Sequence, residues 1–256
     1  MVDRPGPERP RWSIPSGAWP IVGLAVLAPL AWAPGLSFHF DAAPKLVALH
    51  SMAALLLLLS PGGFLRSLET LWVRPAGRLL LLLFGVWALL LVASTVVSVN
   101  IPLSLFGTGW RRFGVITQLA VLCCGIVAAA RFRQDPLYLR FALRALCISG
   151  LVVGAYAVCQ AMGIDPFVDN SLYSPSADVK TLRPPATLGH AAYLASFLLV
   201  VLFAGLANAV REPLGAWKHL CVAAVAVSAA GIAVSGTRAA LADRKSTRLN
   251  SSHLGI

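Results

Sequence analysis

The sequence predicts an all-α membrane protein, a polytopic bundle of about seven transmembrane helices. Its 256 residues are 58% hydrophobic and only 12% charged, and the mean hydropathy is +0.77. Soluble domains carry about 25% charged residues. Seven uncharged runs each approach or exceed the roughly 20 residues that a spanning helix needs. Soluble cores do not repeat such a pattern seven times, so a multi-pass membrane domain is expected.

These uncharged runs fill most of the chain. They are Ile14 to Asp41, Leu46 to Leu65, Leu79 to Trp110, Phe113 to Ala130, Ala145 to Ile164, Pro184 to Val210 and His219 to Thr237. The first is longer than the apolar part of a signal peptide and six more follow, so it is expected to remain as a helix. Pro29 within it predicts a kink, with the freed carbonyl bonded by a neighbouring helix.

The basic residues predict the orientation. The formal net charge is +11, but the charges sit in short loops without interleaved aromatic residues, so nucleic-acid binding is not expected. A cytoplasmic N-terminus places twelve basic residues inside and leaves six outside, namely Lys45, Arg111, Arg112, Lys180, Arg183 and Arg238. Residues 1–13 are then a cytoplasmic tail, residues 14–242 form the membrane domain, and 163–185 is an outer loop.

The last residues are expected to be foreign to the protein. Residues 243–253 read Asp-Arg-Lys-Ser-Thr-Arg-Leu-Asn-Ser-Ser-His, which looks like a sequencing-library adapter translated in one frame. A chance match of that length is very improbable. We therefore expect the native membrane domain to be cut near Ala242, with its C-terminal part missing, and residues 243–256 to be an artefact.

Five cysteines fall inside the uncharged runs, at positions 123, 124, 147, 159 and 221. Neither a disulfide framework nor a metal motif is visible in their spacing, so they are expected to be small buried side chains. No Walker motif, clustered metal ligands or nucleophile motif occurs. No metal and no cofactor are predicted, and ATP hydrolysis and metalloprotease chemistry are disfavoured.

Two adjacent arginines are the strongest candidates for substrate binding. Arg111 and Arg112 lie in Ser104-Leu-Phe-Gly-Thr-Gly-Trp-Arg-Arg-Phe-Gly114, where three glycines allow the backbone to bend at the outer membrane edge. Planar guanidinium forks suit phosphate. The alternative is that both side chains anchor to lipid headgroups.

Further candidates lie near the later runs. Arg238, in Val234-Ser-Gly-Thr-Arg-Ala-Ala240, could enter a cavity because small neighbours permit close helix packing, or could simply mark the membrane boundary. Arg183 is a fourth outer arginine and a candidate substrate ligand. His190 is a weak candidate for a catalytic base or a glycan hydrogen-bonder, with an interfacial anchor as the alternative. Asp41 and Lys45, spaced i,i+4, are expected to neutralise each other.

Several short motifs resemble the O-antigen ligase and polymerase family of bacterial envelope glycosyltransferases. They are Phe40-Asp-Ala-Ala-Pro-Lys45, Ser98-Val-Asn100, Ser104-Leu-Phe-Gly107, Arg111-Arg112-Phe-Gly114, Thr187-Leu-Gly-His190, Leu194-Ala195 and Ser235-Gly-Thr-Arg238. Their order relative to the uncharged runs resembles the family over most of residues 38–242. The chain has Gly-His-Ala-Ala where the family often has Gly-Asn-Pro-Asn, and Thr-Arg-Ala where it often has Ser-Arg-Gly.

The resemblance implies transfer of a glycan from an undecaprenyl-diphosphate carrier, at the periplasmic face of the bacterial inner membrane. The acceptor would be lipid A-core, another glycan or a protein, with membrane lipids as surroundings. It also implies essential Arg and His residues in a large periplasmic loop beyond residue 242, so this fragment alone is expected to be inactive. The alternatives are a multi-span transporter or flippase of a lipid-linked or small-molecule substrate, or a noncatalytic scaffold.

Overall fold

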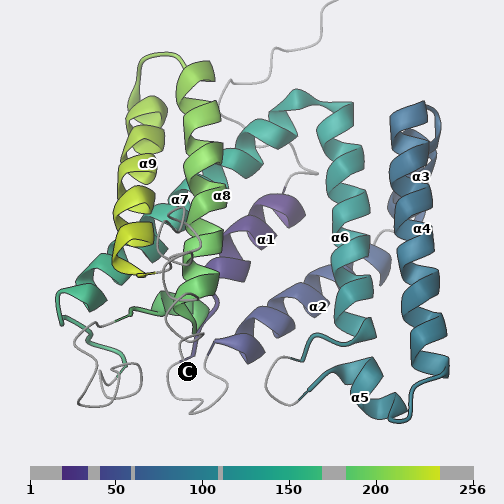
Figure 1. Cartoon of the computed structure of the whole chain (residues 1–256). Helices are drawn as coiled ribbons and strands as arrows, with labels where there is room; N and C mark the ends of the chain where they lie inside the picture. The colour runs from purple at the N-terminus through teal and green to yellow at the C-terminus, as the bar shows by residue number, and fades with distance from the viewer. Residues whose placement is uncertain (1–18, 34–40, 59–60, 109–111, 169–182, 237–256) are drawn as a thin grey trace, which may run out of the picture. The chain divides into compact units, whose positions relative to one another are not determined.

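The computed structural model describes residues 19–33, 41–58, 61–108, 112–168 and 183–236 (Figure 1). Within these residues every regular element is helical and no strand occurs, so the all-α prediction is confirmed for this part of the chain. The elements are α1 (Trp19–Leu30), α2 (Ala42–Leu58), α3 (Pro61–Trp72), α4 (Pro75–Val96), α5 (Ile101–Phe106), α6 (Val115–Gln134), α7 (Pro136–Ala161), the 3-10 turn η2 (Ala186–Leu188), α8 (Ala191–Arg211) and α9 (Ala216–Val234).

Five of these helices have the length and apolar composition of membrane spans: α4, α6, α7, α8 and α9. The pair α2 and α3, bent by 89°, adds a sixth if it forms one broken span. Helix α1 has 12 residues and is only about 18 Å long at 1.5 Å per residue, short of the roughly 30 Å hydrocarbon core. The helices are those of a multi-pass membrane protein. The seventh span and the cytoplasmic N-terminus stay predictions.

Two expected spans are interrupted. The second uncharged run is divided between α2 and α3, and Pro61 begins α3 because a first-turn proline needs no amide donor. The third run forms α4 only to Val96. After it, Asn100 caps the short helix α5, its Oδ1 accepting from the Leu103 amide at 3.1 Å. An uncharged run therefore did not guarantee one unbroken helix.

Pro29 affects α1 differently from the prediction. The helix ends at Leu30, one residue after Pro29, so the expected kink inside a longer helix is wrong for the described residues. The expected compensation is confirmed, however. The carbonyl of Ala25, four residues before Pro29, accepts a hydrogen bond from Ser149 Oγ on α7 at 3.1 Å.

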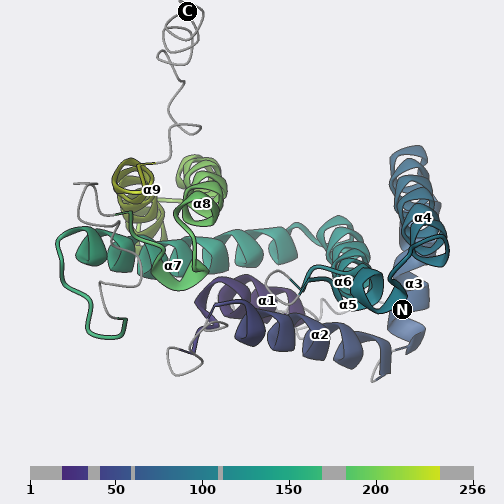
Figure 2. The same ribbon diagram turned by 60° about the horizontal axis from the view of Figure 1, so that its bottom comes forward.

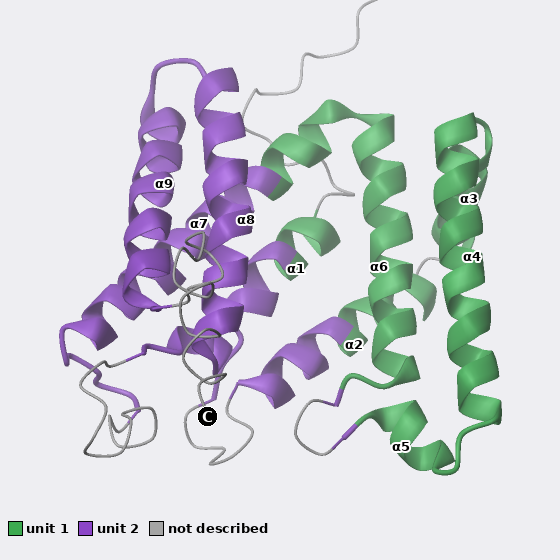
Figure 3. Ribbon diagram, viewed as in Figure 1, with its two compact units in different colours: residues 1–24, 50–107, 113–142 green, residues 25–49, 108–112, 143–256 purple. Residues whose placement is uncertain are grey.

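The chain forms two compact units, coloured separately in Figure 3. Unit 1 comprises residues 1–24, 50–107 and 113–142, and unit 2 comprises residues 25–49, 108–112 and 143–256. In unit 1, α3 packs against both α4 and α6. In unit 2, α8 and α9 form an antiparallel hairpin, and the unit 2 part of α7 crosses that hairpin (Figure 2).

Glycines allow the three helices of unit 2 to pack closely. A methyl group added at Gly154 on α7 would come within 2.8 Å of the Val227 side chain on α9. One added at Gly205 on α8 would come equally close to Val225. Membrane helices associate through such small residues, because lipid offers no hydrophobic drive for helix pairing. The bundle therefore depends on van der Waals contact.

A buried ion pair joins the same helices at the end of α8 that carries its C-terminus. Arg144 on α7 donates from Nε and Nη2 to the two carboxylate oxygens of Glu212, at 2.9 and 2.8 Å. The guanidinium also lies 4.5 Å from the ring centre of Trp217 on α9. The side chains are only 11% and 2% exposed. The fifth uncharged run begins only after Arg144, but α7 begins at Pro136 and includes Arg144, whose charge is paired with Glu212 inside the bundle.

The cysteines largely follow the prediction. Cys123, Cys124, Cys147 and Cys221 are buried, whereas Cys159 is exposed on the surface of α7. All five thiols are free.

Candidate functional site

Lys45 lies at the centre of a polar site in unit 2. Its Nζ donates to the main-chain oxygens of Ala31 at 2.9 Å, Asp41 at 2.9 Å and Thr187 at 2.6 Å. An ammonium has three N–H donors, so all three are used. Lys45 therefore joins the end of α1, the start of α2 and the η2 turn, and it has no donor left for a substrate.

The same contacts close the C-terminal end of α1. The last carbonyls of a helix have no partners within it, and the end carries partial negative charge. Here the Thr187 hydroxyl donates to the Pro29 carbonyl at 2.8 Å, and the Lys45 ammonium bonds the carbonyl of Ala31, just beyond the helix. Thr187 and Lys45, which are 142 positions apart in sequence, thus donate hydrogen bonds to neighbouring carbonyls at the end of α1.

The charge of Asp41 interacts favourably with that of Lys45, as predicted, and the Asp41 side chain also contacts Gly189, next to the η2 turn. Gly189 adopts the left-handed conformation, with φ of +73°, and a methyl group added there would overlap the Asp41 carboxylate. Lys45 bonds the main-chain oxygen of Asp41. The Asp41 side chain is left to face the backbone of the Thr187–His190 segment. Only glycine meets both demands at position 189.

His190 begins α8. Its Nδ1 accepts a hydrogen bond from the Ala192 amide at 3.1 Å, which makes the histidine the N-cap of the helix. Because Nδ1 accepts, the proton of the neutral ring is on Nε2. The residue is exposed, with its ring 5.3 Å from that of Tyr193. His190 can therefore offer an Nε2–H donor to a ligand outside the bundle.

A second polar network holds the segment before η2 against α7. The fully buried Gln160 accepts from the Ala186 amide at 2.8 Å and donates to Asp165 Oδ2 at 2.7 Å. The other oxygen of Asp165 accepts from the Tyr156 hydroxyl at 2.8 Å and from two following backbone amides. Ala186 has a φ of +48°, an unusual value for alanine that these bonds help to hold.

Arg183 is exposed and is held next to the end of α9. Its Nε donates to the Ser235 carbonyl at 3.3 Å, and its side chain runs beside Gly236, whose φ is +60°. A cation at a helix C-terminus is favourable because of the helix dipole. This bond uses one of the five guanidinium donors. Arg183 thus has both an anchoring contact and donors that can face a ligand.

Arg112 lies in the sequence between two glycines that bring the chain close to itself, Gly107 and Gly114. Gly107 has a φ of +79°, and a methyl group added at Gly114 would overlap the backbone of Leu105 and Gly107. The expected role of these two glycines in bending the chain is therefore confirmed. Arg112 is exposed, with φ of +47°, and its amide donates to the Thr108 carbonyl at 2.7 Å.

The structure brings together some of the candidates. Asp41 and Lys45 meet Thr187 and Gly189, and His190 follows directly on α8. Arg183 meets Ser235. Arg111 and Arg238 lie outside the described residues, so a shared cavity of Arg111, Arg112 and Arg238 stays a prediction. Among the described residues no group of three or more His, Cys, Asp or Glu side chains could hold a metal.

Sequence reasoning missed Gln160, which is uncharged and lies inside an apolar run. It also missed His50, whose Nε2 lies 3.4 Å from Thr117 Oγ1 in unit 1. Their polarity within long apolar stretches was the available signal.

Comparisons with known proteins identify no relative of this chain. No family model, no curated protein and no solved structure matches the chain. Any functional argument therefore depends on the residues themselves.

Proposed function

We propose that the protein acts in bacterial envelope polysaccharide assembly, as an O-antigen ligase- or polymerase-like glycan transferase of the inner membrane. The donor is a glycan linked to undecaprenyl diphosphate, and the acceptor is lipid A-core, another glycan or a protein. Transfer takes place at the periplasmic face. The diphosphate leaves, and cationic side chains that stabilise its developing charge supply much of the rate enhancement.

One observation carries the proposal. Asp41–Lys45 and Thr187–His190, parts of two motifs that the resemblance singled out separately, meet around the Lys45 ammonium. The N-terminus of α8 and the C-terminus of α9 lie at the same end of their antiparallel hairpin (Figure 1). His190 and Arg183 are exposed at that end. A hydrogen-bond donor and a guanidinium at this end would suit a diphosphate-linked sugar, which supports the proposal.

Arginine substitutions test the proposal in the full-length protein, in a strain lacking its own copy of the gene. Alanine at Arg111, Arg112, Arg183 and Arg238 is expected to reduce glycan transfer about 100-fold or more, the effect of removing preorganised electrostatic stabilisation. Lysine keeps the charge but loses the bidentate fork, so it should impair transfer less. Surface glycan, measured at equal protein level, is the readout.

Arg211 is the matched control, because it is exposed at the opposite end of α8. Its replacement by alanine should leave surface glycan unchanged. Intact surface glycan in the fourfold alanine variant would mean that these arginines only anchor the protein to headgroups.

A further inference from the structure

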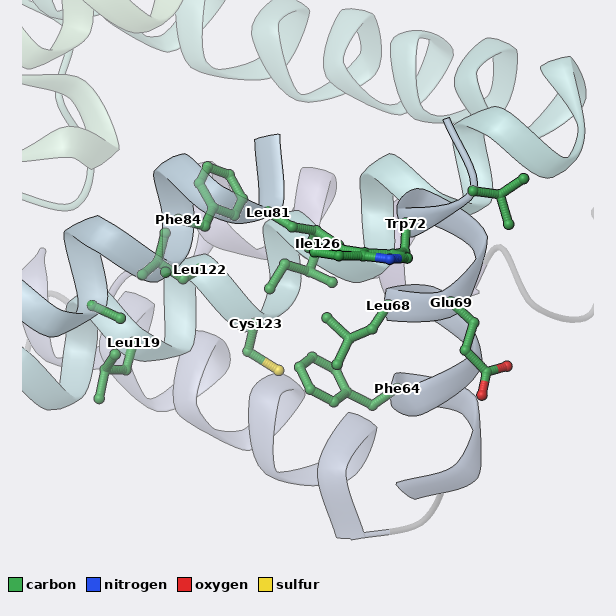
Figure 4. A pocket seen from close by; sticks show the side chains of 13 residues that line it. Phe64, Leu68, Glu69, Trp72, Leu81, Phe84, Leu119, Leu122, Cys123 and Ile126 are labelled. Atoms are coloured by element: carbon green, nitrogen blue, oxygen red, sulfur yellow. The ribbon is translucent and has the colours of Figure 1, made fainter. Parts of the chain in front are cut away.

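An apolar pocket of about 810 Å³ lies in unit 1 among α3, α4 and α6 (Figure 4). Its volume falls within the range of about 300–1,000 Å³ typical of small-molecule sites. Aromatic and aliphatic side chains form its walls, chiefly Phe64, Leu68, Trp72, Phe84, Leu122 and Cys123. Such a lining is complementary to a hydrocarbon ligand.

The surroundings of the pocket are hydrocarbon as well. Both α4 and α6 have the length and composition of membrane spans, and only 6% of the apolar window of α4 is buried. A pocket between such helices therefore opens toward lipid chains rather than water.

One end of the pocket carries the polar groups of a membrane interface. Trp72 lines the pocket near the turn between α3 and α4, and interfacial tryptophans mark headgroup depth. Arg78 donates from Nε to the Trp72 carbonyl at 2.8 Å, and its guanidinium lies 5.8 Å from the Trp72 ring centre. A cation is thereby fixed at this end of the pocket.

Among the described residues, Glu69 is the only charged one that lines the pocket. It is exposed at the edge, with its carboxylate directed away from the apolar side chains (Figure 4). It makes no ion pair with any residue in the described part of the chain. A carboxylate and a guanidinium thus lie at the same end of a hydrocarbon site, an arrangement that complements a zwitterion.

We propose that this pocket binds a phospholipid with a primary-amine headgroup, of the phosphatidylethanolamine class. Its acyl chains occupy the apolar interior, its phosphate accepts from Arg78, and its ammonium pairs with Glu69. An anionic phospholipid lacks the ammonium and would place its net negative charge beside the Glu69 carboxylate. This lipid site is independent of the proposed glycan transfer.

Two glycine substitutions test occupancy of the pocket. Gly85 lines it, and a Cβ added there meets no side chain within 4 Å, so Gly85→Leu is expected to take up pocket volume. Gly62 on α3 is equally open but does not line the pocket, which makes Gly62→Leu the matched control. Each protein is placed in nanodiscs of equimolar palmitoyl-oleoyl phosphatidylethanolamine and phosphatidylglycerol, and retained lipid is counted by native mass spectrometry. Gly85→Leu should lose a bound lipid that Gly62→Leu keeps.

Glu69→Gln tests the headgroup. The unaltered protein should retain phosphatidylethanolamine over phosphatidylglycerol by about fivefold, the ratio expected from one interfacial charge, and Glu69→Gln should bring the two to near equality. Preference for phosphatidylglycerol in the unaltered protein would overturn the proposal. Equal lipid retention by Gly85→Leu and Gly62→Leu would also overturn it. So would an unaltered protein that forms a dimer without bound lipid, if Gly85→Leu dissociates that dimer.

Discussion

Arg144→Leu is expected to lower the free energy of unfolding by about 3–5 kcal/mol, the cost of leaving one charge of a buried pair unpaired. Arg144 makes two hydrogen bonds to Glu212, and both side chains are almost fully buried. Its loss strands a carboxylate at the junction of three helices. Thermal unfolding of the purified protein in detergent, together with its level in the membrane, measures the effect.

A double variant that replaces both Arg144 and Glu212 separates the cost of a buried unpaired charge from any stability that the ion pair itself contributes. Glu212→Leu alone should destabilise by a similar amount, whereas the double variant should recover most of the loss, because an apolar pair leaves no buried charge. Arg211→Leu, at the exposed position next to Glu212, is the control for loss of a basic residue at this end of the bundle. Additive losses in the double variant would show that the two side chains do not act as a pair.

The second large effect is expected at Lys45. Lys45→Met keeps much of the side-chain volume but removes three charge-assisted hydrogen bonds, and should destabilise the protein by about 3 kcal/mol or more. The carbonyls of Ala31, Asp41 and Thr187 would lose their common donor. Thermal unfolding and protease resistance of the loop before α8 are the measurements.

Lys45→Arg makes the test specific. A planar fork cannot place its donors like the three N–H groups of one ammonium, so the arginine variant should also lose stability although it keeps the charge. Arg211→Met on α8 should have a small effect, because Arg211 is exposed and surface substitutions rarely exceed about 0.5 kcal/mol. Equal stability of Lys45→Met and Arg211→Met would contradict the central role given to Lys45.

Much of the helical architecture followed from the sequence, because long apolar stretches in a membrane can satisfy their backbone only as helices. Helix ends were less predictable. Counting uncharged residues treats every charge as a boundary, so it excluded Arg144 from the fifth span, whereas α7 begins at Pro136 and the charge of Arg144 is paired with Glu212. The same count ignored Asn100. This uncharged residue caps α5, so the third uncharged stretch contains a second, separate helix.

The candidate site was predictable as a set of residues but not as a geometry. The motifs containing Lys45 and Thr187 were recognised separately, yet no local pattern reveals a contact across 142 residues. The i,i+4 spacing of Asp41 and Lys45 suggested a local pair, because sequence distance was the only distance available. In the structure, hydrogen bonds to backbone carbonyls of distant segments position the Lys45 side chain, and the contact with Gly189 positions the Asp41 side chain.

The face of the membrane on which carrier-linked glycan accumulates tests the proposed function most directly. In a strain lacking the gene, glycan still linked to undecaprenyl diphosphate should accumulate at the periplasmic face. Glycosidase added to spheroplasts with an intact inner membrane should then release it, and the full-length protein should remove the accumulation. Carrier-linked glycan that becomes digestible only after the membrane is opened would contradict glycan transfer and indicate a flippase.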